Sequence, residues 1–145
     1  MTWAGVILAA GSGERMKSRM AKPLHRVCGV PMLTHAVQAA VGARLDPIVT
    51  VVQPAHQEQP EIREAAGESS LAVQEHQQGT AHATEAARTY IGKAATVFIF
   101  YADAPLIRHE TIATIIKSHE NTEAILTVAT VVDPPVSGFG RVTRG

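Results

Sequence analysis

Near its amino terminus the chain reads GVILAAGSG over residues 5–13, an apolar run that ends in a glycine-rich turn. Residues 5–10 are apolar and partly β-branched, which is typical of a buried strand. The glycines that follow let the backbone turn sharply and bring its amide hydrogens close to a ligand. This stretch therefore predicts a strand followed by a loop that suits phosphate oxygens.

Similar apolar runs recur along the chain, and segments with helical spacing lie between them. The expected strands are residues 5–10, 47–52, 71–73, 96–101 and 124–132. The expected helices are residues 32–43, 58–66, 80–91 and 111–119, with Pro31 at the start of the first, Thr80 as the N-cap of the third, and 53–59 as a solvated loop. This alternation predicts an α/β protein with a parallel sheet covered by helices on both faces.

Composition favours one ordinary globular domain. The chain has 145 residues, enough to bury a core, and we find no linker or internal repeat, so we expect a single domain over residues 1–145. Thirteen Lys and Arg balance thirteen Asp and Glu, so no overall charge favours nucleic acid or an anionic membrane as a partner. The amino terminus has neither a basic leader nor a spanning apolar segment, and we expect a cytoplasmic protein.

Cys28 is the only cysteine, which excludes an intramolecular disulfide framework. Its expected role is that of a small buried apolar side chain. Seven histidines are present, but His76 and His82, beside the glutamine-rich segment, lack the further ligands that a zinc site needs. No Ser, His and Asp set has a spacing that indicates a nucleophile.

A local excess of positive charge follows the glycines. Only one acid, Glu14, lies among five basic residues, which are Arg15, Lys17, Arg19, Lys22 and Arg26. This pattern favours a small polyanion, and a solvated basic loop is the alternative. The loop is not a P-loop, because no Gly-Lys-Ser/Thr follows, and a dinucleotide fingerprint would need glycine in place of Met16. Arg15 and Lys22 are two cations that can hold a triphosphate from different sides.

Ligands of open parallel sheets bind beyond the carboxyl ends of the strands. That rule selects residues 11–25, 74–80 and 102–106. In the last of these, Asp103 follows the most apolar strand, and its carboxylate suits a hard cation. The alternative for Asp103 is an aspartate that bonds its own backbone in the turn before Pro105.

Several motifs occur in a characteristic order. They are LAAGSGERMKS at 8–18, KPLH at 22–25, GVPML at 29–33, Gln74 with QQGTAHA at 77–83, YADAPL at 101–106, and GFGRV at 138–142. In this order they resemble the sugar-nucleotide pyrophosphorylases, most closely the amino-terminal uridylyltransferase domains of the bacterial bifunctional enzymes that make UDP-N-acetylglucosamine. The resemblance implies a Rossmann-like, three-layer α/β/α fold with a mostly parallel sheet, here without the family's C-terminal strands.

The resemblance also implies a reaction: transfer of a uridylyl group from UTP to a sugar 1-phosphate, with N-acetylglucosamine 1-phosphate as the expected acceptor, Mg²⁺ as the cofactor, and release of pyrophosphate. Arg15 would face the leaving pyrophosphate and Lys22 the α-phosphate, although a surface lysine is the alternative for Lys22. Asp103 would bind magnesium, and Gly140 would contact the sugar. The nucleotide would be bound by Leu8, Ala10, Gly11, Gly13, Gln74, Gln77, Gly79 and Thr80.

A side-chain amide offers a donor and an acceptor to the edge of uracil, so the glutamines of this segment could read the base. The alternative is that they are solvent-exposed, as glutamines in loops often are.

The sequence departs from the family at Glu14, Ala21 and Ala102, where threonine, proline and glycine are usual. In the relatives the chain continues beyond the position of Gly145 and supplies sugar contacts and a second metal ligand. Without those strands a sheet edge would be exposed, for which self-association is one solution. Two alternatives to uridylyl transfer stay open. One is a thymidylyl, cytidylyl or molybdopterin nucleotidyltransferase, and the other is a nucleotide-binding fragment without turnover.

Overall fold

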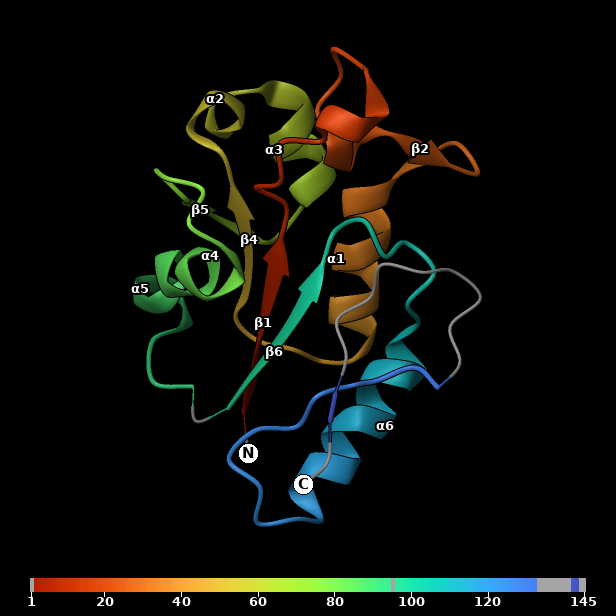
Figure 1. Ribbon diagram of the computed structural model, residues 1–145, viewed down its shortest axis with the longest axis vertical. Coiled ribbons are helices and arrows are strands. Elements are labelled where there is room, and N and C mark those ends of the chain that lie inside the picture. The colour runs from red at the N-terminus through yellow and green to blue at the C-terminus, as the bar shows by residue number, and fades with distance from the viewer. Residues whose placement is uncertain (1, 95, 133–141, 144–145) are drawn as a thin grey trace.

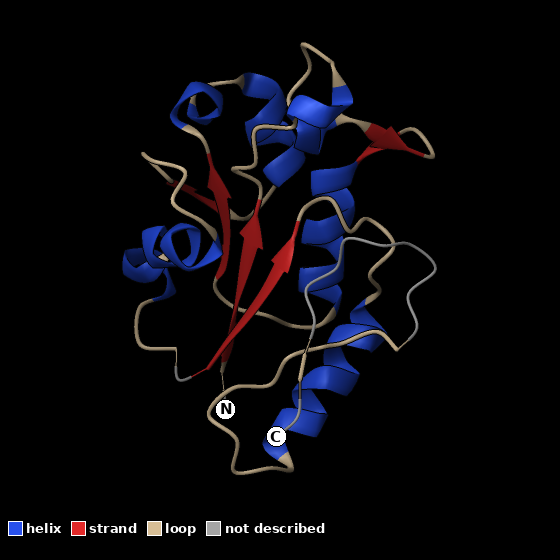
Figure 2. Ribbon diagram, viewed as in Figure 1, coloured by secondary structure: helices blue, strands red, loops and turns tan. Residues whose placement is uncertain are grey.

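A computed structural model describes residues 2–94, 96–132 and 142–143, and its centre is a sheet of parallel strands. The strands are β1 (Trp3–Leu8), β4 (Ile48–Val52), β5 (Ser70–Val73) and β6 (Thr96–Tyr101), in the spatial order β5-β4-β1-β6. Figure 2 shows them side by side in red. A small antiparallel hairpin of β2 (Arg26–Val27) and β3 (Val30–Pro31) lies apart from this sheet.

Helices cover both faces of the sheet. α1 (Met32–Gly42), α3 (Pro60–Ala66) and α6 (His109–Glu120) lie on one face, and α4 (Thr80–Ala86) and α5 (Arg88–Ile91) lie on the other (Figure 1). Three short helices, η1 (Glu14–Met16), η2 (Lys22–Leu24) and α2 (Pro54–Gln57), lie at the carboxyl ends of the strands. The expected three-layer α/β/α fold with a parallel sheet is thereby confirmed.

The two-residue period of a strand divides β1 between two cores. Ile7 packs with Leu33 of α1 and Ile112 of α6, whereas Val6 and Leu8 belong to a separate cluster on the side of α4 and α5. Because both faces of β1 are covered, every residue of this strand is buried. The apolar run near the amino terminus therefore forms one of the two inner strands of the sheet.

Several expected boundaries were wrong. The segment 80–91 forms two helices, and Thr80 is the first helical residue after the cap, Gly79. The helix expected from residue 58 begins at Pro60, because proline fits the first turn of a helix rather than its interior. The expected loop at 53–59 contains α2, which also begins at a proline, Pro54.

The strand expected over residues 124–132 is absent, and its apolar side chains are exposed, among them Ile125, Leu126 and Val132. A strand needs a neighbour to pair its backbone N–H and C=O groups. No described strand occupies the outer edge of β6, and residues 124–132 do not pair with it, so their backbone lacks the partner that a strand needs. Self-association through the open edge of β6 remains a prediction.

Cys28 is exposed, so the expectation of a buried side chain was wrong. It occupies the turn between β2 and β3 together with Gly29, and both residues have positive φ, 50° and 80°. Two such residues form the tight turn that joins short antiparallel strands, and that turn points away from the core. In the described ranges, no helix is long and apolar enough to cross a membrane.

Candidate active site

A pocket of about 310 Å³ opens at the carboxyl ends of β1 and β6. The chain runs outward from β1 through β4 to β5 and then returns to place β6 on the other side of β1. Such a reversal of strand order opens a crevice at the sheet edge, where α/β proteins bind ligands. All three loops selected from the sequence reach this pocket, which is lined by Leu8, Ala9, Ala10, Gly11, Lys22, Pro23, Gln74, Gln77, Gly79, Thr80, Ala83, Tyr101, Ala102 and Asp103.

The glycine loop turns immediately after β1. Gly13 has φ of 66°, a left-handed conformation that favours glycine, and a Cβ built there would lie 3.0 Å from the Cβ of Lys22. The missing side chain thus allows Lys22 to pack against the loop. Gly11 lines the pocket, and a Cβ at this position would meet no atom within 4 Å.

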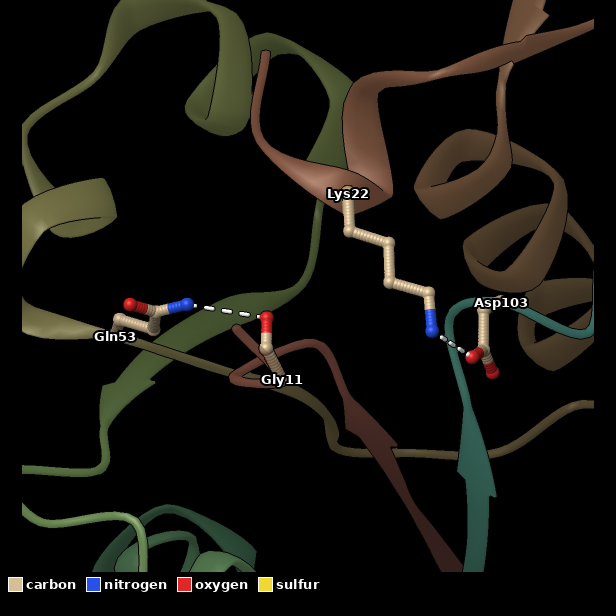
Figure 3. A network of polar contacts seen from close by, with 4 residues as sticks. All are labelled: Gly11, Lys22, Gln53 and Asp103. Carbon is tan, nitrogen blue, oxygen red and sulfur yellow. Dashed lines mark hydrogen bonds and ion pairs between the residues drawn. The ribbon is translucent and has the colours of Figure 1, made fainter. Parts of the chain in front are cut away.

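Lys22 and Asp103 are brought together although 81 positions separate them. Lys22 begins η2, and its Nζ forms an ion pair with Oδ2 of Asp103, directly beyond the end of β6 (Figure 3). Their side chains are 29% and 40% exposed. A partly exposed pair contributes little to stability, so the pair matters for where it places a cation and a carboxylate.

The glutamine segment is held against the end of β1. Gln74 is 5% exposed, and its Nε2 donates to the carbonyl of Gly79 at 3.3 Å and approaches Nδ1 of His82 at 3.2 Å. Nε2 of Gln77 donates to the carbonyl of Ala10 at 2.8 Å. These bonds hold both side chains at the pocket.

Some lining residues were not predicted as site residues. Tyr101 is one, and its hydroxyl lies 3.1 Å from Oγ1 of Thr80. Strand alternation could have identified it, since Phe100 is buried in the core beneath α1 and Tyr101 must face the opposite side. Gln53 is another polar residue at this end of the sheet, with Nε2 3.0 Å from the carbonyl oxygen of Gly11. Its position directly after a strand was the available signal.

Two predicted site residues are not placed. Gly140 lies outside the described residues, and Arg15 is described only as part of η1, without its side chain. The predicted residues that line the pocket are Leu8, Ala10, Gly11, Lys22, Gln74, Gln77, Gly79, Thr80 and Asp103, while Gly13 lies just behind Lys22.

Asp103 offers the pocket a carboxylate, the ligand type that hard cations prefer. Within residues 2–94 and 96–132 no three His, Cys, Asp or Glu side chains gather to enclose a metal ion. This donor set fits a cation such as Mg²⁺, which commonly takes one or two carboxylates and completes its shell with water and substrate phosphates. It does not fit a structural zinc site.

Sequence comparison connects this site to known proteins. Residues 5–140 match the model of the MobA-like NTP transferase domain. The chain is 41% identical over 141 residues to the bifunctional protein GlmU of Brevibacillus brevis and 39% identical over 140 residues to that of Listeria monocytogenes. Each alignment covers 96% of this chain and 30% of the relative, so the chain spans about a third of the length of these proteins.

Solved structures share the fold. CMP:2-keto-3-deoxy-manno-octonic acid synthetase in complex with CTP superposes with a TM-score of 0.63 at 23% identity, over 86% of this chain and 49% of the other. Rv0371c from Mycobacterium tuberculosis superposes with a TM-score of 0.70 at 22% identity, over 85% and 63%. The family match and these superpositions confirm the resemblance and the Rossmann-like architecture expected from the motifs. The chain therefore belongs to the MobA-like NTP transferase domain family.

Proposed function

We propose that this protein transfers a uridylyl group from UTP to a sugar 1-phosphate, with N-acetylglucosamine 1-phosphate as acceptor and release of pyrophosphate. The observation that carries this proposal is the convergence of Lys22, Asp103 and the glutamine segment on one pocket. Family membership supports nucleotidyl transfer, and the motif resemblance supports the choice of UTP and of the acceptor.

Among the described residues that line the pocket, Lys22 is the positively charged one, and its side chain packs against Gly13 of the glycine loop. Its ammonium group would exchange Asp103 for a phosphate oxygen and stabilise the negative charge of the transition state, an electrostatic role that positioned cations perform well. Arg15 would hold the leaving pyrophosphate. Asp103 would hold Mg²⁺, which when bound would neutralise charge on the phosphates.

The glutamines would read the base. The amide nitrogens of Gln74 and Gln77 donate to protein carbonyls, which orients both side chains, and their side-chain oxygens could accept the N3–H of uracil. Gly79 has no side chain, and a Cβ built there would meet no protein atom within 4 Å. The backbone at this position is therefore open to close approach by a ring. The hydroxyl pair of Thr80 and Tyr101 adds polar groups at the rim of the pocket.

The test is pyrophosphate release from UTP with N-acetylglucosamine 1-phosphate and Mg²⁺. We expect release only when both substrates and the cation are present, and UTP to be preferred over CTP, dTTP, ATP and GTP. A preference for CTP or dTTP would keep the reaction class and change the base. A preference for a purine would contradict the uridylyl assignment.

A second candidate is nucleotide binding without turnover. It is favoured by the pocket, whose lining among the described residues holds one carboxylate, that of Asp103. Tight binding of UTP without product from any sugar 1-phosphate would support this candidate. Steady product formation by the purified chain would eliminate it.

A further inference from the structure

Two successive carbonyl groups at the exit of β1 are each held by a glutamine from a different part of the sheet. Gln77 donates to Ala10, and Gln53 donates to Gly11. Gln77 belongs to the glutamine segment already assigned to the nucleotide. Gln53 lies outside the pocket lining, and the reaction proposed above gives it no role.

The parallel pairing of β1 and β4 explains how Gln53 reaches the loop. Leu8 lies opposite Val51, and the amide of Ala9 donates to the carbonyl of Val51 at 2.8 Å, so the two strands remain side by side to their ends. Gln53 is the first residue beyond β4 and has extended backbone angles, φ −74° and ψ 156°. Figure 3 shows its amide directed at Gly11, while Lys22 extends from the other side of the loop toward Asp103.

The glycine loop needs such a contact because its own residues restrain it weakly. Glycine has more backbone freedom than any other residue, and a side chain at position 11 would have met no neighbour within 4 Å. A planar trans peptide directs its N–H opposite to its C=O. By fixing the carbonyl of Gly11, Gln53 therefore also fixes the direction of the amide N–H of Ser12.

The bond also affects the electrostatics of the loop. A carbonyl oxygen carries partial negative charge and repels phosphate, whereas a donor on that oxygen offsets the charge. We propose that Gln53 is a positioning residue for the phosphate groups of the nucleotide, acting through the Gly11 peptide. This inference rests on the proposed nucleotide-binding function and adds to it a residue that the motifs do not contain.

The test compares Gln53→Met, which keeps the length but cannot donate, with the wild type. Binding of UTP and of uridine, which lacks phosphates, is measured by calorimetry or competition. We expect UTP affinity to fall about threefold to tenfold, the effect of one lost hydrogen bond, and uridine affinity to stay unchanged. Gln53→Glu should weaken UTP further, because a carboxylate cannot donate to Gly11 and repels phosphate.

Gln59→Ala is the matched control. Gln59 lies in the same stretch, and its Nε2 also donates to a backbone carbonyl, that of Ala55 at 3.2 Å, away from the pocket. It should bind UTP like the wild type. Equal UTP affinity of Gln53→Met and Gln59→Ala, or parallel losses for UTP and uridine in Gln53→Met, would overturn the inference. Absence of UTP binding by the wild type would instead overturn the proposed function, and this inference with it.

Discussion

The two faces of the sheet are packed with side chains of different size. Beneath α1, α3 and α6 the core contains large residues such as Trp3, Leu33, Phe98 and Ile112. Beneath α4 and α5 the buried core is made of valines, alanines and one leucine, Leu8. Each buried methylene contributes about 0.8 kcal/mol, so the first face carries more of the hydrophobic stabilisation.

Both cores reach the pocket, and the core with small side chains contributes more of the pocket lining, while Ala9 and Ala102 come from the other core. Leu8, Ala10 and Ala83 belong to the small core and also line the pocket. Small residues at the end of β1 leave room for a ligand, and the opposite core can hold the strands in register without them. Substitutions on the two faces should therefore separate stability from ligand binding.

The largest effect on stability is expected from Leu33→Ala in α1, since Leu33 is fully buried on the face with large side chains. The free energy of unfolding should fall by about 2–5 kcal/mol, measured by urea denaturation. UTP affinity of the folded protein should not change. Leu33→Met, which conserves volume, should cost less than about 1.5 kcal/mol. A large loss of UTP affinity in folded Leu33→Ala would break the separation between the faces.

Asp103→Asn should lower activity and leave stability nearly unchanged. Pyrophosphate release should fall on the order of 100-fold or more, as when a positioned electrostatic group is lost, while the melting temperature changes little. Asp46→Asn is the control, because Asp46 lies near Trp3 at the other end of the sheet and should retain full activity. Wild-type rates in Asp103→Asn would contradict the assignment of Asp103.

Gly79→Ala should lower both stability and UTP affinity. The residue has φ of 95° and ψ of −179°, a region that is essentially restricted to glycine, so a Cβ should cost about 1–3 kcal/mol of stability. The shifted backbone should also weaken UTP binding. Gly67→Ala is the control, because Gly67 has φ of 53° and lies outside the pocket lining. It should lose stability and keep its UTP affinity, and a matching loss of affinity would count against a role for Gly79 in binding.

The smallest effect concerns His56 of α2. Burial lowers its pKa below the ordinary value of 6.5, and among the described residues its buried Nδ1 has no hydrogen-bond partner. The unfolded chain therefore binds a proton more readily than the folded protein. This contribution to stability is complete above pH 6.5 and decreases as the pH falls toward the lowered pKa. His56→Gln should reduce the loss of stability measured between these pH values, and an unchanged pH dependence would contradict this account.

Local sequence patterns predicted much of the fold and of the pocket. The apolar runs at residues 5–10 and 96–101 both correspond to strands, and Asp103 and Gln74 were found because each follows a strand. The same patterns predicted a strand at 124–132, where β propensity is high. A strand forms only where a segment pairs with a neighbour, which local propensity does not reveal. Residues 124–132 do not pair with the open edge of β6 and remain without strand structure.

The sequence by itself determined which groups the proposed function uses: glycines after a strand, a local group of cations, and a carboxylate at the end of an apolar run. Only the tertiary structure decided that β6 lies beside β1, which places Asp103 against Lys22, and that β4 ends where Gln53 can reach Gly11. The physical reason is that periodicity reports each segment's local preference and burial. Strand order and register depend instead on pairing between distant segments.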